Sequence, residues 1–145
     1  MKKRLQAVID GASRGNPGHA AIGVLIYDEN GELLMKYHRY LGECTNNVAE
    51  YQALINCLKT AVQLAASANG LADRGLIITI HSDSELLVKQ FHGEYRIKNP
   101  QLRELAQQVQ HLIEQHELEV DLVHVLRSET READRLANIA LNLHE

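Results

Sequence analysis

Four carboxylic acids in this 145-residue chain stand far apart in sequence, each beside a signal for the start or end of a strand or helix. They are Asp10, Glu50, Asp83 and Asp134. Carboxylates at the ends of different elements can converge in the fold, and converged carboxylates bind hard cations such as Mg²⁺ or Mn²⁺. These four residues are therefore our candidate metal ligands and catalytic groups.

The chemistry open to such a group is metal-assisted hydrolysis of a phosphodiester. Two cations about 4 Å apart activate a water and stabilise charge on the attacking and leaving oxygens. For Glu50 or Asp134 alone, a carboxylate favoured by a helix dipole would explain the residue equally well. Asp10 and Asp83 are predicted to end apolar strands, where an unpaired carboxylate is costly, so the set favours a bound metal.

The elements that must position these residues begin with three predicted antiparallel strands. Leu5 to Asp10 alternates between apolar and polar residues. Ala20 to Tyr27 and Glu32 to Leu41 flank Asn30-Gly31, which is a strong β-hairpin signal. Helical spacing of apolar residues follows from Asn46 to about Ala68, with Glu50 expected in the first turn.

The second half of the chain predicts one strand, two helices, a strand and a helix. The run Leu76 to Ile80 is typical of a buried strand, and a loop is expected between Asn69 and Gly75. Helices are predicted from about Ser84 to Phe91 and from Pro100 to about His116. A last strand is expected over Glu119 to Val125 and a last helix over Arg131 to Leu143, with Asp134 in its first turn.

Four segments carry a resemblance to a known family. They read DGASRGNPG at 10–18, TNNVAEYQAL at 45–54, HSDSELLV at 81–88 and READRLAN at 131–138. In this order and spacing they resemble type 1 ribonuclease H over nearly the whole chain. The resemblance implies an α/β fold of the ribonuclease H type, with a mixed five-stranded sheet of three antiparallel strands and then two parallel ones, flanked by helices.

The same resemblance implies roles for the carboxylates. Asp10 would be shared by two Mg²⁺ or Mn²⁺ ions that are both present when substrate is bound. Glu50 and Asp83 would complete one metal site, and Asp134 would belong to the more labile second site.

Substrate contacts are expected from two polar segments. By composition, 11–18 is a turn joining strands, whereas the functional interpretation is a close backbone approach to substrate, with Gly11, Ser13 and Asn16 as substrate-binding residues and Asn16 offering its amide to the RNA strand. Three further residues, Thr45, Asn46 and Asn47, are good helix caps, and by resemblance they contact the phosphate of the DNA strand, sugars and base edges.

The chain departs from the best-known bacterial members in three places. Gly93 to Pro100 is too short for their basic handle, and the chain has no tryptophan, so we expect weaker hybrid binding. His124 precedes the last carboxylate but falls within a predicted strand, and Arg127 matches an arginine that contacts the scissile phosphate in some members. Glu85, also assigned to substrate binding, replaces a frequent glutamine and cannot donate hydrogen bonds as glutamine does.

Composition sets the remaining expectations. With 45% hydrophobic residues, the chain fits a single domain over residues 1–145. The formal net charge of −4 falls near zero once the four candidate ligands are set aside, which is compatible with nucleic acid when cations are bound. Neither Cys44 nor Cys57 has a metal-ligand spacing, and no apolar run approaches membrane-helix length, so we expect a cytoplasmic monomer with no membrane contact.

The resulting hypothesis is a metal-dependent endonuclease that cuts the RNA strand of RNA/DNA hybrids to 5′-phosphate and 3′-hydroxyl ends. Another nuclease on this fold is disfavoured, since the exonucleases begin with Asp-x-Glu and this chain has Asp10-Gly11-Ala12. A catalytically weak module that binds hybrid or duplex RNA stays as the alternative.

Overall fold

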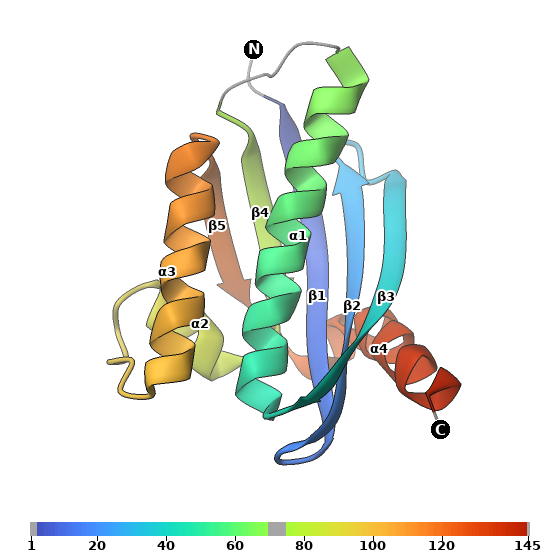
Figure 1. The fold of residues 1–145 in the computed structure, drawn as a ribbon. Coiled ribbons are helices and arrows are strands. Elements are labelled where there is room, and N and C mark those ends of the chain that lie inside the picture. Colours follow the sequence, from blue (N-terminus) through green and yellow to red (C-terminus); the bar gives the residue numbers. More distant parts are fainter. Residues whose placement is uncertain (1–2, 70–74, 145) are drawn as a thin grey trace.

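The computed structural model describes residues 3–69 and 75–144, and its centre is a five-stranded mixed sheet in the order β3-β2-β1-β4-β5 (Figure 1). The first three strands, β1 (Arg4–Gly15), β2 (Gly18–Asp28) and β3 (Leu33–Cys44), pair antiparallel. The last two, β4 (Ile77–Ser82) and β5 (Glu119–His124), add in parallel beside β1. The predicted sheet is confirmed.

The first hairpin differs from its prediction. Residues 11–15 belong to β1, whose pairing with β2 runs on to Gly15 and Gly18, so the turn shrinks to Asn16 and a cis Pro17. The glycines suggested a loop, but Gly15 accommodates a φ of +106° beside this tight turn. Asp10 therefore lies inside β1, and the prediction that it ends the strand is wrong.

The extent of the parallel pairing between β1 and β4 explains why Asp10 still lies at the edge of that pairing. The register of β1 with β4 extends from Arg4 and Ile77 only to Val8 and His81. Beyond that point β1 continues beside β2 alone, and Asp10 pairs with Gly23. Asp10 thus lies just past the place where β1 and β4 stop pairing, and Asp83 directly follows the end of β4.

The second hairpin and the long helix agree closely with the sequence patterns. The Gly31 N–H donates to the Asp28 carbonyl at 3.0 Å, which closes the predicted turn. Helix α1 (Asn46–Asn69) begins where predicted, so Glu50 is its fifth residue and lies past the first turn rather than within it. The predicted loop after α1 falls on residues 70–74, outside the described residues.

The remaining helices also begin at recognisable signals. Ser84 caps α2 (Glu85–Phe91) and Asn99 caps α3 (Pro100–Gln115), with Pro100 at the start of the helix. Helix α4 (Arg131–Leu143) has the predicted bounds. A short 3₁₀ turn, η1 (Arg127–Glu129), comes between β5 and α4.

Helices lie on both faces of the sheet. Alternate β1 residues such as Leu5, Ala7 and Ile9 join the main core with α1 and α3, whereas Ala12 packs in a smaller cluster with α4. In Figure 1, α1 and α3 run along one face, and α4 crosses the lower end of β1 to β3. Gly23 allows this crossing, because an added Cβ there would lie 1.9 Å from the Ala133 carbonyl oxygen.

Two further observations concern the expectations from composition. Cys57 is fully buried in α1 and Cys44 is half-buried at the end of β3, and both thiols are free. Within the described residues, every helix is either too short or too polar to cross a membrane.

Candidate active site

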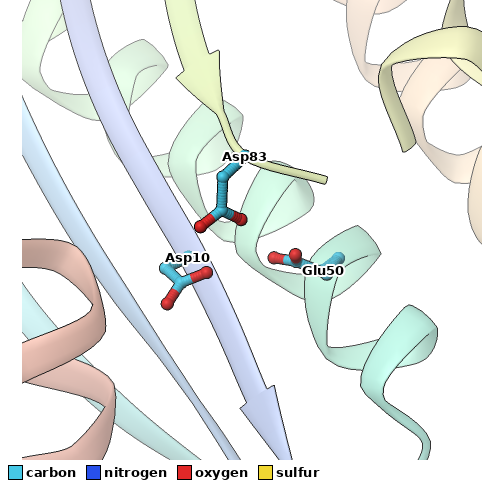
Figure 2. Close-up of side chains that lie close together, drawn as sticks. All are labelled: Asp10, Glu50 and Asp83. Atoms are coloured by element: carbon cyan, nitrogen blue, oxygen red, sulfur yellow. The ribbon is translucent and has the colours of Figure 1, made fainter. Parts of the chain in front are cut away.

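Three carboxylates from three elements meet beside the point where β1 and β4 separate. Asp10 comes from β1, Asp83 from the residue after β4, and Glu50 from α1, as Figure 2 shows. One oxygen from each lies within 4.8 Å of the others. This spacing lets a single cation contact all three carboxylates, and oxygen ligands of this kind suit Mg²⁺ or Mn²⁺.

Gly11 brings α1 close enough for Glu50 to reach the cluster. A Cβ added at Gly11 would lie 2.4 Å from the backbone carbon of Ala49 and 2.6 Å from the backbone nitrogen of Glu50. The Gly11 N–H also donates to Glu50 Oε1 at 2.7 Å. The absence of a side chain at Gly11 therefore lets α1 pack closely against β1, and this contact fixes Glu50 against β1.

Burial makes this cluster electrostatically expensive without a cation. Asp10 and Glu50 are only 6% and 4% exposed. Burial, followed by repulsion from Glu50 and Asp83, raises the pKa of Asp10 to about 9. Burial and Asp83 likewise raise the pKa of Glu50 to about 8, although the Gly11 N–H opposes this shift. A bound cation would relieve the repulsion, so the donor set fits the divalent metal that the sequence predicts.

The last helix and the turn before it form the other side of the site. Asp134 lies in the first turn of α4, as predicted, and its hydrogen bond and charge help raise the pKa of Asp10. Arg127 in η1 places Nε 3.8 Å from Asp83 Oδ2, and its side chain is 92% exposed. A cavity of about 180 Å³ lies between the two sides, lined by Asp10, Gly11, Ala12, Ser13, Asn46, Glu50, Asp83, Arg127 and Asp134.

The predicted substrate residues divide between the cavity and its surroundings. Gly11, Ser13, Asn46 and Arg127 line the cavity with the four carboxylates. The other four, Asn16, Thr45, Asn47 and Glu85, are not among its lining residues.

Two of these outer residues hold the start of α1. Asn16 Oδ1 accepts the Asn46 N–H at 3.1 Å, and Thr45 Oγ1 accepts the Val48 N–H at 3.2 Å. Ser13 Oγ donates to the Cys44 carbonyl at 3.2 Å, which ties β1 to the end of β3. Glu85 is on α2 in an ion pair with Lys89 at 3.1 Å.

One residue at the site was missed by the sequence analysis. The Thr130 hydroxyl donates to Asp83 Oδ2 at 2.8 Å, and Thr130 is completely buried. A threonine just before a helix is typical of a helix cap, and such a signal does not reveal a partner 47 residues away. His124, by contrast, is the last residue of β5, as the strand interpretation predicted.

Comparison with known proteins places this site in a family. A family model described as reverse transcriptase-like matches residues 8–140. The crystal structure of ribonuclease H1 from Halobacterium salinarum superposes with a TM-score of 0.82 at 36% identity, covering 96% of this chain and 98% of that one. This chain belongs to the type 1 ribonuclease H family.

Other ribonuclease H1 structures agree with this placement. LC11-RNase H1 in complex with an RNA/DNA hybrid gives a TM-score of 0.86 at 38% identity, covering 97% of this chain and 98% of that one. A bifunctional protein of Mycobacterium tuberculosis is 37% identical over 143 residues, 98% of this chain. This ribonuclease H chain spans 36% of the length of that protein and 65% of the curated ribonuclease HI from Halobacterium salinarum.

Proposed function

We propose that this chain is an endonuclease that hydrolyses the RNA strand of RNA/DNA hybrids and leaves 5′-phosphate and 3′-hydroxyl ends. The observation that carries the proposal is the convergence of Asp10, Glu50 and Asp83 within 4.8 Å in a chain of the ribonuclease H family. LC11-RNase H1, which matches 97% of this chain, is seen with a hybrid bound. Hybrid duplex is therefore the substrate class to test first.

The proposed cofactor is a pair of Mg²⁺ or Mn²⁺ ions bound together with substrate. When bound, such ions supply an activated water and stabilise charge on the attacking and leaving oxygens. Asp10 would contact both ions, Glu50 and Asp83 would hold one, and Asp134 the other. The buried pair Asp10 and Glu50 fits this role because their pKa values of about 9 and about 8 show how poorly the cluster tolerates its own charge.

The chain's own residues would place the RNA strand over the carboxylates. Ser13 and Asn46 lie on the cavity wall near the start of α1, where N–H groups and small polar side chains suit sugar and phosphate. Gly11 and Arg127 line the same cavity, and the Arg127 guanidinium can donate to a phosphate oxygen. Asn16, Thr45, Asn47 and Glu85 would make contacts outside the cavity as the duplex extends past it.

The wider setting is part of the same proposal. We take residues 1–145 as a single ribonuclease H domain that acts as a monomer, with the free thiols Cys44 and Cys57 pointing to a reducing compartment such as the cytoplasm. A protein partner and a membrane have no part in the proposed reaction.

The test is a cleavage panel with labelled RNA/DNA hybrid, duplex RNA, duplex DNA and single strands, each with Mg²⁺, Mn²⁺ or a chelator. We expect cutting of the RNA strand of the hybrid only, dependent on metal and lost in Asp10→Asn, with hybrid binding retained by the variant. Hybrid binding by the parent protein without cleavage under any condition would replace the nuclease with the binding module. Cleavage that is equal in parent and Asp10→Asn would show a contaminating nuclease.

A further inference from the structure

Thr130 links two parts of the site that are distant in sequence. Its hydroxyl donates to Asp83 Oδ2 at 2.8 Å, across 47 positions of the chain. Thr130 is 0% exposed, so its hydroxyl is shielded from bulk water. The contact joins the residue that follows η1 to the carboxylate that follows β4.

The Thr130 hydroxyl is not used as a helix cap, although Thr130 occupies the N-cap position of α4. A threonine there ordinarily accepts an N–H from the first turn. Thr45 does so at the start of α1, where its Oγ1 accepts the Val48 N–H at 3.2 Å. At α4 no such side-chain bond forms. The two threonines therefore show that the Thr130 hydroxyl serves Asp83 instead of its own helix.

The single proton of the Thr130 hydroxyl is donated to Asp83. Thr130 Oγ1 has two acceptors in reach, Asp83 Oδ2 at 2.8 Å and the Arg127 carbonyl oxygen at 3.2 Å. A hydroxyl has one proton, and the bond to an ionised carboxylate is the shorter and stronger kind. Arg127 Nε approaches the same oxygen, Oδ2, at 3.8 Å. Both contacts hold one oxygen of Asp83, and the carboxylate keeps a second oxygen for a cation.

The Thr130 backbone connects this contact to the last carboxylate. The Asp134 N–H donates to the Thr130 carbonyl at 2.9 Å, and the Thr130 N–H donates to the Arg127 carbonyl at 3.2 Å. One buried residue thus contacts Asp83 through its side chain and the Asp134 turn through its backbone.

We propose that Thr130 is a positioning residue that fixes the Asp83 carboxylate for a divalent cation and sets its place relative to Asp134. The inference rests on the proposed function, in which both carboxylates bind metal. Partners of metal ligands orient the ligand, and their loss costs about 10–100-fold in metal affinity or activity.

Two substitutions of Thr130 separate the effect of its hydroxyl from the effect of its side-chain shape. Thr130→Val keeps the branched shape and removes the donor, whereas Thr130→Ser keeps the donor and removes a methyl group. Thr60→Val is the matched control, because the Thr60 hydroxyl also makes two contacts, with Tyr37 at 2.8 Å and the Asn56 carbonyl at 2.9 Å. Thr60 is ten residues along α1 from Glu50, about 15 Å at 1.5 Å per residue.

The first measurement is Mn²⁺ binding to the substrate-free proteins by electron paramagnetic resonance, with circular dichroism to report folding. We expect Thr130→Val to bind Mn²⁺ about 10–100-fold more weakly, and Thr130→Ser and Thr60→Val to resemble the parent. Thr130→Ala gives a second donor-free variant if the valine variant folds poorly. Parent-like Mn²⁺ affinity in a folded donor-free variant overturns the proposal, as does Thr130→Ser binding as weakly as Thr130→Val.

The second measurement is hybrid cleavage at saturating substrate and at varied substrate concentration. A positioning role lowers kcat in Thr130→Val and leaves KM for the hybrid close to the parent value, because the substrate contacts are untouched. An effect confined to KM contradicts it. If the parent binds Mn²⁺ but cleaves nothing, the proposed function fails, while the Mn²⁺ comparison still decides the role of Thr130.

Discussion

The two sides of the cavity are built differently. The inner wall consists of Asp10, Glu50 and Asp83, which come from the central strands and α1. The outer wall consists of Arg127 and Asp134, which come from η1 and the first turn of α4. Asp10 and Glu50 are 6% and 4% exposed, whereas the Arg127 side chain is 92% exposed.

This difference in burial gives the two walls different roles. Strand pairing holds Asp10, the contact of Gly11 with α1 holds Glu50, and the Thr130 hydroxyl contacts Asp83, so these carboxylates are placed before any ligand arrives. Burial of these neighbouring carboxylates costs electrostatic free energy, which appears as the raised pKa values of Asp10 and Glu50. The outer wall is exposed to solvent and can adjust to substrate. We therefore expect substitutions of the inner wall to abolish function and those of the outer wall to tune it.

The largest expected effect contrasts one carboxylate from each wall. Glu50→Gln removes a buried carboxylate of the proposed metal site, and we expect hybrid cleavage to fall by at least about a thousandfold, since losing several kcal/mol of transition-state stabilisation has this effect. Asp134→Asn removes an exposed carboxylate of the proposed second site and should cost less, with partial recovery at high Mn²⁺ concentration. Rates of labelled-hybrid cleavage over a metal titration provide the measurement. Equal losses in the two variants would erase the distinction between the walls.

The second prediction concerns Gly11, where the backbone of β1 contacts α1 and supports the inner wall. Gly11→Ala places a Cβ 2.4 Å from the Ala49 carbon, so β1 and α1 must separate, and we expect a stability loss of about 1–3 kcal/mol or more together with loss of cleavage. Gly93→Ala is the control, because its added Cβ meets nothing within 4 Å and only its φ of +78° is strained. Urea unfolding measures the free energy of unfolding of both variants. Gly11→Ala with parent stability and activity would contradict the close approach.

The helices and the second hairpin were predictable because their signals are local. The pattern over Arg131 to Leu143 repeats with helical period, and the bounds of α4 follow from it. The turn at Asn30-Gly31 needs a residue with positive φ, and Gly31 at +83° supplies it. In each case the residues that decide the structure lie within a few positions of one another.

The missed features depend on partners distant in sequence. The glycines of 11–18 suggested a turn, yet Gly11 is small because α1 packs against it, which no local pattern reveals. For the same reason β1 was predicted to end at Asp10. Thr130 has an ordinary helix-start signal, and its link to Asp83 exists only once β4 and α4 are side by side. Tertiary contacts of this kind set the details of the site.

The third prediction measures the electrostatic cost of the inner wall without metal. The pKa of Asp10 is raised from 3.8 to about 9, so the folded state favours the protonated form. Its contribution to stability is present below about pH 3.8 and is lost as the pH rises toward 9. In chelator at pH 8, Asp10→Asn should therefore unfold at a higher temperature than the parent, by on the order of 5 °C.

The control for this experiment is the same pair of proteins at pH 5 and with Mg²⁺. The difference between parent and Asp10→Asn should shrink at pH 5, because pH 5 is close to 3.8, the pKa above which the contribution of Asp10 begins to be lost. Mg²⁺ should stabilise the parent more than the variant. A parent that is more stable than Asp10→Asn in chelator at pH 8 would mean that the inner wall carries no such cost.

The smallest expected effect belongs to the outer wall. Arg127 reaches Asp83 at 3.8 Å with a 92% exposed side chain, so this ion pair contributes little to folding, and Arg127→Ala should leave the free energy of unfolding within about 1 kcal/mol of the parent. Its guanidinium lines the cavity, where a phosphate would gain a charge-assisted hydrogen bond. We therefore expect KM for the hybrid to rise about three- to tenfold in Arg127→Ala at low salt, with part of the loss restored in Arg127→Lys.

The salt dependence separates this role from a positioning role at Asp83. If Arg127 attracts phosphate, the gap in KM between parent and Arg127→Ala narrows as salt screens the interaction. If Arg127 instead holds the Asp83 carboxylate in place, the loss appears in kcat, persists at high salt and is accompanied by weaker Mn²⁺ binding. That second result would give Arg127 the same role as Thr130, which is to hold the Asp83 carboxylate, and would leave Asp134 as the one adjustable residue of the outer wall.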